Sequence, residues 1–146
     1  MKITDTVGSL LKNKGSNRVL SVTPDQSVYE AIDKMAVESI GALLVISQGR
    51  LVGILSERDY TRKIALLGKN SRETRVRDIM TANVLVVTPQ TRTRQCMAIM
   101  SEKNIRHLPV VDGDTVVGML SIRDLMNDII ADHEYTISQL ESYIKG

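Results

Sequence analysis

The first third of the chain alternates short apolar runs with amphipathic stretches, and this pattern predicts a mixed α/β fold. Residues 19–22 form a short apolar strand that ends at a Thr-Pro pair, because proline cannot donate to a strand ladder. Ser27 begins a Ser-x-x-Glu capping box, which opens a helix with one apolar face. Residues 42–46 and 51–55 are apolar runs around a polar turn and predict a hairpin. A Ser-x-x-Asp box then opens a second helix over residues 56–67.

The whole pattern occurs a second time, displaced by 65 residues (84 − 19 = 65). Residues 19–24 align with 84–89, and residues 53–59 align with 118–124, without a gap. Roughly 15 of about 42 aligned positions are identical, far more than chance gives at one fixed offset. The chain therefore contains an internal duplication, and we expect the order β-α-β-β-α in each copy.

We expect the two copies to pack sheet to sheet about a pseudo-twofold axis, because one copy alone would leave an apolar sheet face in water. The expected segments are an N-terminal docking helix in 1–18, a first repeat over 19–68, a linker over 69–75, a second repeat over 76–131 and a helical tail over 132–146. The C-terminal stretch either packs back on the core or makes a dimer contact, and we favour the dimer contact. Its apolar residues at helical spacing are Ile129, Ile130, Ile137, Leu140 and Ile144.

Each copy has a Thr-Pro pair at its front and a Gly-h-h-Ser-x-x-Asp segment at its back, where h is apolar. Asp78-Ile79-Met80-Thr81 stands before the second copy, and Arg106-His107-Leu108-Pro109-Val110 lies within it. With these motifs the chain resembles a pair of CBS domains, the cystathionine-β-synthase-type regulatory repeat. It looks like a stand-alone pair rather than an enzyme that carries one.

The resemblance implies a regulatory module that binds adenosyl ligands such as AMP, ADP, ATP, NAD(H) or S-adenosylmethionine in clefts between the repeats, commonly as a homodimer. It implies no required cofactor, since the nucleotide is a regulatory ligand whose occupancy is signalled to a regulated protein by conformational change. The residues that the resemblance places at the ligand are Thr23, Ile40, Gly41, Ala42, Ser56, Arg58, Asp59, Thr88, Ile105, Arg106, His107, Pro109, Ser121, Arg123 and Asp124.

The two Ser-x-x-Asp elements have two interpretations. As capping boxes, Ser56 with Asp59 and Ser121 with Asp124 stabilise their helix starts by about 0.5–2 kcal/mol. As a ligand site, the acids accept hydrogen bonds from a ribose diol, while the serines and the free N–H groups of the helix start hold ribose or phosphate. Both interpretations can hold, because an exposed cap can also serve a ligand.

Arg58 and Arg123 lie in the first turn of these helices, where a cation opposes the helix dipole. Phosphate recognition by a guanidinium explains an arginine there in both copies, and a solvated surface arginine is the alternative. Arg62 and Lys63 add two cations that could reach a di- or triphosphate, although a solvated helix face is the favoured explanation for both. Thr23 and Thr88 are turn residues before proline that, by the resemblance, also mark the cleft wall.

The two clefts are expected to differ chemically. In the first copy the sequence Ile-Gly-Ala at residues 40–42 leaves space, whereas Ile-Arg-His at residues 105–107 fills the corresponding space with cations or donors. We therefore expect the second cleft to bind more tightly. A half-buried structural role is the alternative for His107, and Cys96, on an apolar helix face, is expected to be a small buried hydrophobe.

Composition narrows the classes of function. The 19 Lys and Arg against 17 Asp and Glu give a net charge of +2, and there is no Phe or Trp, so neither a basic footprint nor an aromatic platform for nucleic acid is present. Zinc-ligand spacings and the common nucleotide-enzyme and hydrolase motifs are absent, so we expect no enzyme. No run of 18 apolar residues occurs, and the single cysteine fits a reducing compartment. We expect no secretory signal, no membrane segment and a cytoplasmic location.

Two hypotheses remain. The first is a regulatory homodimer in which a bound nucleotide favours one arrangement of the repeats. The second is a structural dimerisation module whose capping boxes only cap. The sequence names neither the ligand nor the regulated partner.

Overall fold

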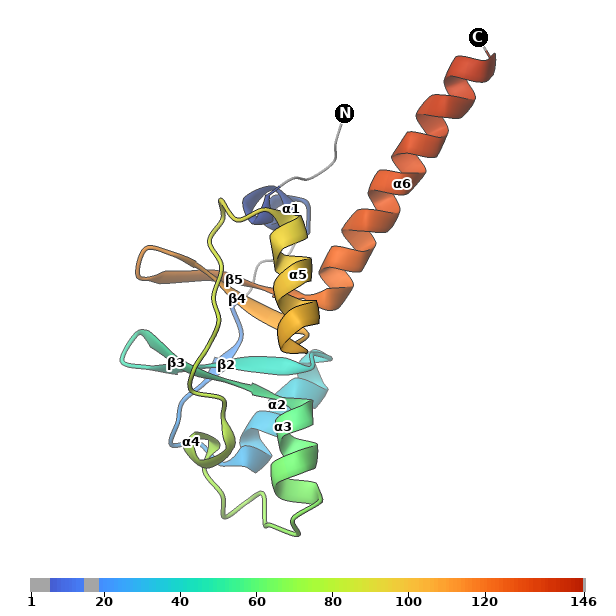
Figure 1. The fold of residues 1–146 in the computed structure, drawn as a ribbon. Helices are drawn as coiled ribbons and strands as arrows, with labels where there is room; N and C mark the ends of the chain where they lie inside the picture. Colours follow the sequence, from blue (N-terminus) through green and yellow to red (C-terminus); the bar gives the residue numbers. More distant parts are fainter. Residues whose placement is uncertain (1–5, 15–18, 146) are drawn as a thin grey trace. The chain divides into compact units, whose positions relative to one another are not determined.

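The computed structural model describes residues 6–14 and 19–145 of the 146-residue chain. It contains two compact units, each with its own core (Figure 1). One unit spans residues 19–85, and the other combines residues 6–14 with residues 86–145. A mixed α/β fold with two repeats is therefore confirmed. The rest of the expected N-terminal segment, 1–5 and 15–18, lies outside the described residues, as does Gly146.

The unit of residues 19–85 contains a three-stranded sheet in the order β1-β2-β3. β1 pairs with β2 in parallel, and β2 pairs with β3 antiparallel as the expected hairpin. Its elements are β1 (Ser21–Val22), α2 (Val28–Glu38), β2 (Ala42–Ser47), β3 (Arg50–Ser56), α3 (Glu57–Tyr60), η1 (Thr61–Ala65) and α4 (Val76–Ile79). α2 starts at a closed capping box, in which Glu30 N donates to Ser27 Oγ at 3.1 Å.

The second helix of this repeat changes its geometry part-way. The second helix expected over residues 56–67 is present: it begins as α3 and continues as the π-helical turn η1. Leu66 N donates to Thr61 O at 3.0 Å, which is the five-residue spacing of a π-turn. The turn leaves Ile64 only 2 % exposed in the core. The chain leaves the helix near Gly68, whose φ of +66° is in the left-handed region that glycine adopts readily.

The other unit contains a two-stranded antiparallel sheet, β4-β5. Its elements are α1 (Val7–Lys14), α5 (Thr93–Lys103), β4 (His107–Asp112), β5 (Thr115–Ser121) and α6 (Ile122–Lys145). The strand expected at residues 84–87 is wrong, since only Val87 pairs, in an isolated parallel bridge with Val110. Leu85 and Val86 are 44 % and 43 % exposed, so no burial of their side chains favours an extended strand there. α6 runs without a break through the expected boundary between residues 131 and 132.

Both cores are aliphatic, as the composition requires. The core of residues 19–85 includes Val28, Met35, Leu43, Val45 and Leu55, and the other core includes Val7, Leu10, Met100, Leu108 and Leu120. Cys96 lies in the second core with no exposed surface, so the expectation that it is a small buried hydrophobe is confirmed.

Each unit is completed by a segment that precedes the other repeat in the chain. The segment at α4 approaches β3 at Gly53, where an added Cβ would lie 2.6 Å from Met80 Sδ. In the other unit α1 approaches β5 at Gly118, where an added Cβ would lie 3.2 Å from Leu11 Cδ1. The glycine of each Gly-h-h-Ser-x-x-Asp segment thus allows a close approach rather than a special backbone conformation.

Candidate functional site

The first Ser-x-x-Asp element lies where β3 passes into α3, and it forms a closed capping box. Ser56 N donates to Asp59 Oδ2 at 2.9 Å, and Asp59 N donates to Ser56 Oγ at 3.2 Å. The other carboxylate oxygen, Oδ1, lies 3.3 Å from the ammonium of Lys63, which also donates to Ile79 O at 2.8 Å. The Asp59 side chain is 14 % exposed, so its charge is largely withdrawn from water and held by these donors. The Lys63 ammonium is therefore held by two groups of its own unit, the Asp59 carboxylate and the Ile79 carbonyl.

The second Ser-x-x-Asp element forms the same box at the start of α6. Ser121 N donates to Asp124 Oδ2 at 2.8 Å, and Asp124 N donates to Ser121 Oγ at 3.1 Å. Lys14, in the last turn of α1, donates to the same Oδ2 at 3.0 Å and to Met119 O at 3.1 Å. Sequence reasoning missed Lys14, because its partner is 110 residues away and no local pattern marks the pair.

The first strand of each hairpin, β2 or β4, begins beside the Ser-x-x-Asp helix start of the same unit. Ala42, at the start of β2, pairs in register with the capping serine of α3, and His107, at the start of β4, pairs with that of α6. The first residue of α3 donates its N–H to Gly41 O at 3.0 Å, and the first residue of α6 donates to Arg106 O at 2.8 Å. Most of the predicted residues of each copy are therefore brought together around one capping box.

The backbone N–H groups at these helix starts are largely occupied. In both units the N–H groups of the serine, of the next residue and of the aspartate have protein acceptors. The expectation that these groups are free for an anion is therefore wrong at those three positions.

The arginines at the two starts differ in exposure. Arg106 and Arg123 are exposed at the start of α6, whereas Arg58, at the start of α3, is half-buried. An exposed guanidinium keeps its rotational freedom and its five donors for a ligand in solution. The second start thus offers two exposed guanidinium groups, in agreement with the chemical difference expected between the two copies.

His107 lies half-buried beside the second capping box. Burial lowers the pKa of its imidazole below the ordinary value of 6.5; Asp124 acts in the opposite direction, and Arg106 and Lys14 lower this pKa further. The imidazole is therefore mostly neutral at pH 7. In that form it can donate or accept a hydrogen bond, but it adds no positive charge for a phosphate.

The remaining residues predicted at the ligand make hydrogen bonds or packing contacts within their own units. Thr23 and Thr88 are exposed turn residues whose N–H groups donate to Gln26 Oε1 and Thr91 Oγ1 at 2.9 and 3.0 Å. Ile40 and Ile105 are partly buried against the two cores. Pro109 is buried, and its carbonyl accepts from Val87 N.

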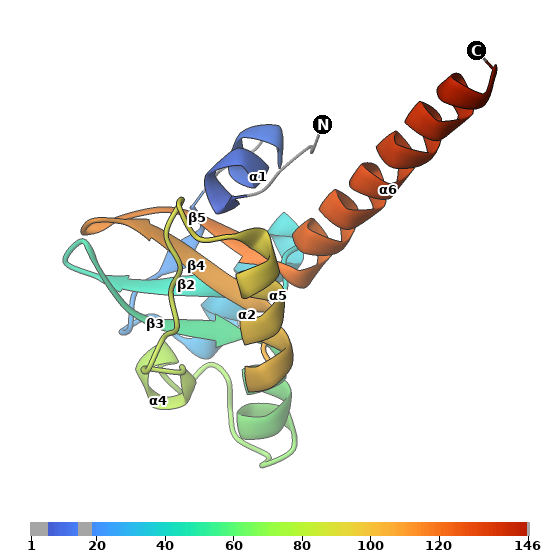
Figure 2. The same ribbon diagram turned by 45° about the horizontal axis from the view of Figure 1, so that its top comes forward.

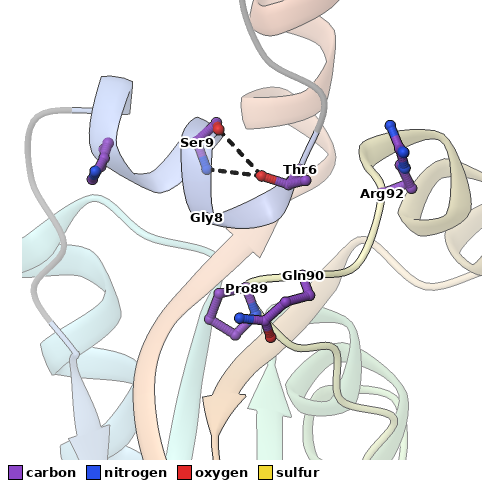
Figure 3. A pocket seen from close by; sticks show the side chains of 7 residues that line it. Thr6, Gly8, Ser9, Pro89, Gln90 and Arg92 are labelled. Atoms are coloured by element: carbon purple, nitrogen blue, oxygen red, sulfur yellow. Dashed lines mark hydrogen bonds between the residues drawn. The ribbon is translucent and has the colours of Figure 1, made fainter.

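A hollow of about 630 Å³ lies at the N-terminal end of α1 (Figure 3), and no residue of the two Ser-x-x-Asp boxes is among those that line it. Its backbone N–H groups are already occupied, since Val7 N donates to Thr91 O and Gly8 N donates to Pro89 O. Figure 3 shows Ser9 turned back toward Thr6, whose Oγ1 accepts from Ser9 N at 3.2 Å. The lining residues are Thr6, Gly8, Ser9, Lys12, Pro89, Gln90 and Arg92. None of them is among the residues predicted at the ligand.

Among the residues that the structure describes, no group of three or more His, Cys, Asp or Glu side chains is placed to hold a metal ion. None of the helices in the described part of the chain is both long enough and apolar enough to cross a membrane.

Comparison with known proteins identifies the repeats. Residues 11–66 and 76–131 each match the family described as "CBS domain". A CBS domain-containing protein, CBSX3, mitochondrial, from Arabidopsis thaliana is 37 % identical over 149 residues, covering 97 % of this chain and 72 % of its own length.

Solved structures agree with this match. The crystal structure of the CBS domain NE2398 is 47 % identical, with a TM-score of 0.82 over 86 % of this chain and 97 % of that one. The CBS-domain containing protein ATU1752 from Agrobacterium tumefaciens is 33 % identical, with a TM-score of 0.81 over 86 % of this chain and 94 % of that one. The two ranges that match the family, residues 11–66 and 76–131, include the Ser-x-x-Asp boxes of both repeats.

Proposed function

The chain belongs to the CBS-domain family, and on this basis we propose that it is a regulatory module that binds an adenosyl ligand, such as AMP, ADP, ATP or NAD(H), at its Ser-x-x-Asp helix starts. Proteins of this kind are regulatory rather than catalytic. The observation that carries the proposal is the pair of partly buried carboxylates, 14 % and 15 % exposed, at equivalent places in the two repeats. Each is fixed in position by its own serine.

The carboxylates can bind ribose without losing their caps. An ionised carboxylate has about four lone-pair sites for hydrogen bonds. Asp59 receives the N–H and the hydroxyl of Ser56 on Oδ2 and the ammonium of Lys63 on Oδ1. Among the described residues, Asp124 receives Ser121 N and Lys14 Nζ on Oδ2. Because the exposed guanidinium groups of Arg106 and Arg123 stand at the same helix start, that start is the tighter site in this proposal.

Phosphate recognition at the second start rests on side-chain cations. Arg123 lies next to Asp124 in the first helical turn, and Arg106 lies just before β4. Guanidinium groups bind phosphate oxygens through paired, charge-assisted hydrogen bonds. The Lys14 ammonium, 3.0 Å from Asp124, adds a third positive charge near the ribose position. AMP therefore fits this start better than uncharged adenosine.

Regulation requires that the ligand prefer one conformation of the protein. A ligand with equal affinity for two states shifts neither population, however tightly it binds. We propose that α1 takes part in this preference, because Lys14 connects it to the carboxylate that the ribose would use. The proposal includes a homodimer, an unidentified regulated protein, and a reducing compartment such as the cytoplasm, which a buried, unpaired Cys96 fits.

Thermal unfolding with a ligand panel tests the proposal. The panel is AMP, ADP, ATP, NAD, NADH and S-adenosylmethionine, measured on the wild type, Asp59→Asn and Asp124→Asn. A ligand at 100 times its Kd stabilises the folded state by about 2.7 kcal/mol, which raises Tm by about 5–10 °C in a chain of this size. We expect a rise for one class of ligand that is lost mainly in Asp124→Asn.

The third capping box supplies the matched control. Glu30→Gln alters the box of Ser27 at the start of α2, which has no part in the proposed site. This variant is expected to lower the basal Tm slightly and to keep the full ligand-induced rise. A flat panel at millimolar ligand, or an equal response in Asp124→Asn and the wild type, contradicts ligand binding at these starts and favours the structural dimerisation module.

A further inference from the structure

The distal part of α6 is a helix without a core of its own. α6 runs from Ile122 to Lys145, and Figure 2 shows it extending beyond the strands and α5 of its own unit. Its contributions to the core of that unit, Ile122 and Leu125, come from its first turn. The last 14 residues, 132–145, are about as long as the shortest helices that hold together alone in water, which are roughly 12–15 residues. This part of α6 needs a partner to be a stable helix.

Five apolar residues of α6 fall, together with His133, on a seven-residue repeat, while Ile122, Leu125 and Ile129 lie outside it. Their spacing alternates four and three, the pattern of positions a and d in a coiled coil. The residues of this seam are Met126, Ile130, His133, Ile137 and Leu140, and the sequence continues it at Ile144. The four apolar members with described exposure are 54 %, 52 %, 56 % and 58 % exposed. A 3.5-residue period matches another helix of the same period along its whole length.

We infer that the distal part of α6 pairs in parallel with α6 of a second copy of this chain to form a short two-stranded coiled coil. The inference is independent of any ligand. The seam over residues 126–144 is about 28 Å long at 1.5 Å per residue. A second copy supplies the same seam in the same register, so each apolar residue meets its own counterpart.

Charge decides the orientation of the two helices. Glu134 and Glu141 occupy the e positions that flank the seam, and the g positions are Ile129 and Thr136. In a parallel pair the e positions lie opposite the g positions of the other helix, so each glutamate meets an uncharged residue. In an antiparallel pair the e positions lie opposite one another, and the glutamates would repel. The acidic flanks therefore favour the parallel arrangement.

His133 is the one polar residue of the seam within 126–140. In the parallel arrangement it lies beside its own counterpart and the e position of the other helix, which is Glu134. A single polar residue at such a position sets register at a cost in stability. His133 thus explains how two seams of otherwise similar apolar residues find one alignment.

Sedimentation equilibrium of the full chain tests the inference. Ile137→Glu places a charge in the seam, and Ser138→Glu places the same charge on the adjacent exposed position, outside it. We expect the wild type and Ser138→Glu to dimerise with similar Kd, and Ile137→Glu to raise Kd at least about tenfold, or 1.4 kcal/mol. His133→Leu is expected to lower Kd by about tenfold. All three altered side chains are exposed, and thermal unfolding of each variant checks that folding is intact.

A cross-link tests the orientation separately. Leu140→Cys in a parallel pair places two thiols opposite each other, and oxidation is expected to give a covalent dimer that the wild type, with only buried Cys96, does not form. A wild type that stays monomeric at about 100 µM overturns the inference and points to a helix of another protein as the occupant. A dimer that Ile137→Glu leaves intact overturns it as well, because the dimer contact then lies elsewhere.

Discussion

Replacing Gly53 by alanine should destabilise the unit of residues 19–85, because a segment from beyond the first repeat passes directly over this position. The added Cβ would lie 2.6 Å from Met80 Sδ, 3.0 Å from Met80 Cγ and 3.1 Å from Thr81 O. The thioether can move aside, but the carbonyl is held, since Ile54 N donates to it at 3.0 Å and Thr81 N donates back to Ile54 O at 2.9 Å. Relief therefore strains a pair of backbone hydrogen bonds.

Gly118 provides the matched comparison. The atoms nearest to its added Cβ would be the two Cδ atoms of Leu11, both at 3.2 Å, and Leu11 Cγ at 3.8 Å, and all three belong to a side chain that can rotate. Overpacking costs about 1–3 kcal/mol, and the loss of glycine's freedom in the unfolded chain returns about 0.4–1 kcal/mol. We expect Gly53→Ala to lose about 1 kcal/mol and Gly118→Ala to stay within about 0.5 kcal/mol of the wild type.

Urea unfolding measures both variants. With a slope of about 2 kcal/mol per molar urea, Gly53→Ala should unfold at a midpoint about 0.5 M lower than the wild type, with the slope unchanged. On this reasoning the backbone of the α4 segment, and not a side chain alone, determines how much stability Gly53→Ala loses. Equal urea midpoints for Gly53→Ala and Gly118→Ala, or a lower midpoint for Gly118→Ala, would refute it.

The site gives two further predictions about stability. A double-mutant cycle of Lys14→Met and Asp124→Asn, measured by urea unfolding, should give a coupling of about 0.5–1 kcal/mol, because the lysine side chain is 32 % exposed; a coupling that does not weaken in 1 M salt would contradict a screened ion pair. The lowered pKa of His107 means that the unfolded chain takes up a proton before the folded one, so stability contributed by this residue is present above pH 6.5 and is lost as pH falls below it. Tm measured from pH 7.5 to 5 should fall more in the wild type than in His107→Gln, and parallel curves would show that this histidine is not the cause.

The parts that the sequence predicts well are those governed by neighbours in the chain. The boxes at Ser27, Ser56 and Ser121 follow from interactions across three residues, and all three are closed in the structure. The hairpins follow equally from apolar runs on either side of a turn.

Long-range packing determines the features of the fold and of the site that the sequence does not predict. Nothing near Lys14 in the sequence indicates a carboxylate 110 residues away. The strand expected at residues 84–87 is reduced to one bridge at Val87, although its residues match those of the first copy. The helix expected after Ser56 becomes a π-turn at Thr61, which Ile64 uses to reach the core. Propensity alone predicts neither outcome, because burial against distant residues overrides it.

Calorimetric titration of the chain with AMP and with adenosine tests the central claim most directly. We predict that AMP binds, that Asp124→Asn raises its Kd at least about tenfold, and that Arg123→Ala raises the Kd of AMP while leaving that of adenosine unchanged. Glu30→Gln should bind as the wild type does. The absence of binding heat for AMP, ADP, ATP, NAD and NADH at millimolar concentration, or an Asp124→Asn variant that binds AMP as tightly as the wild type, would contradict the assignment of these helix starts to a nucleotide.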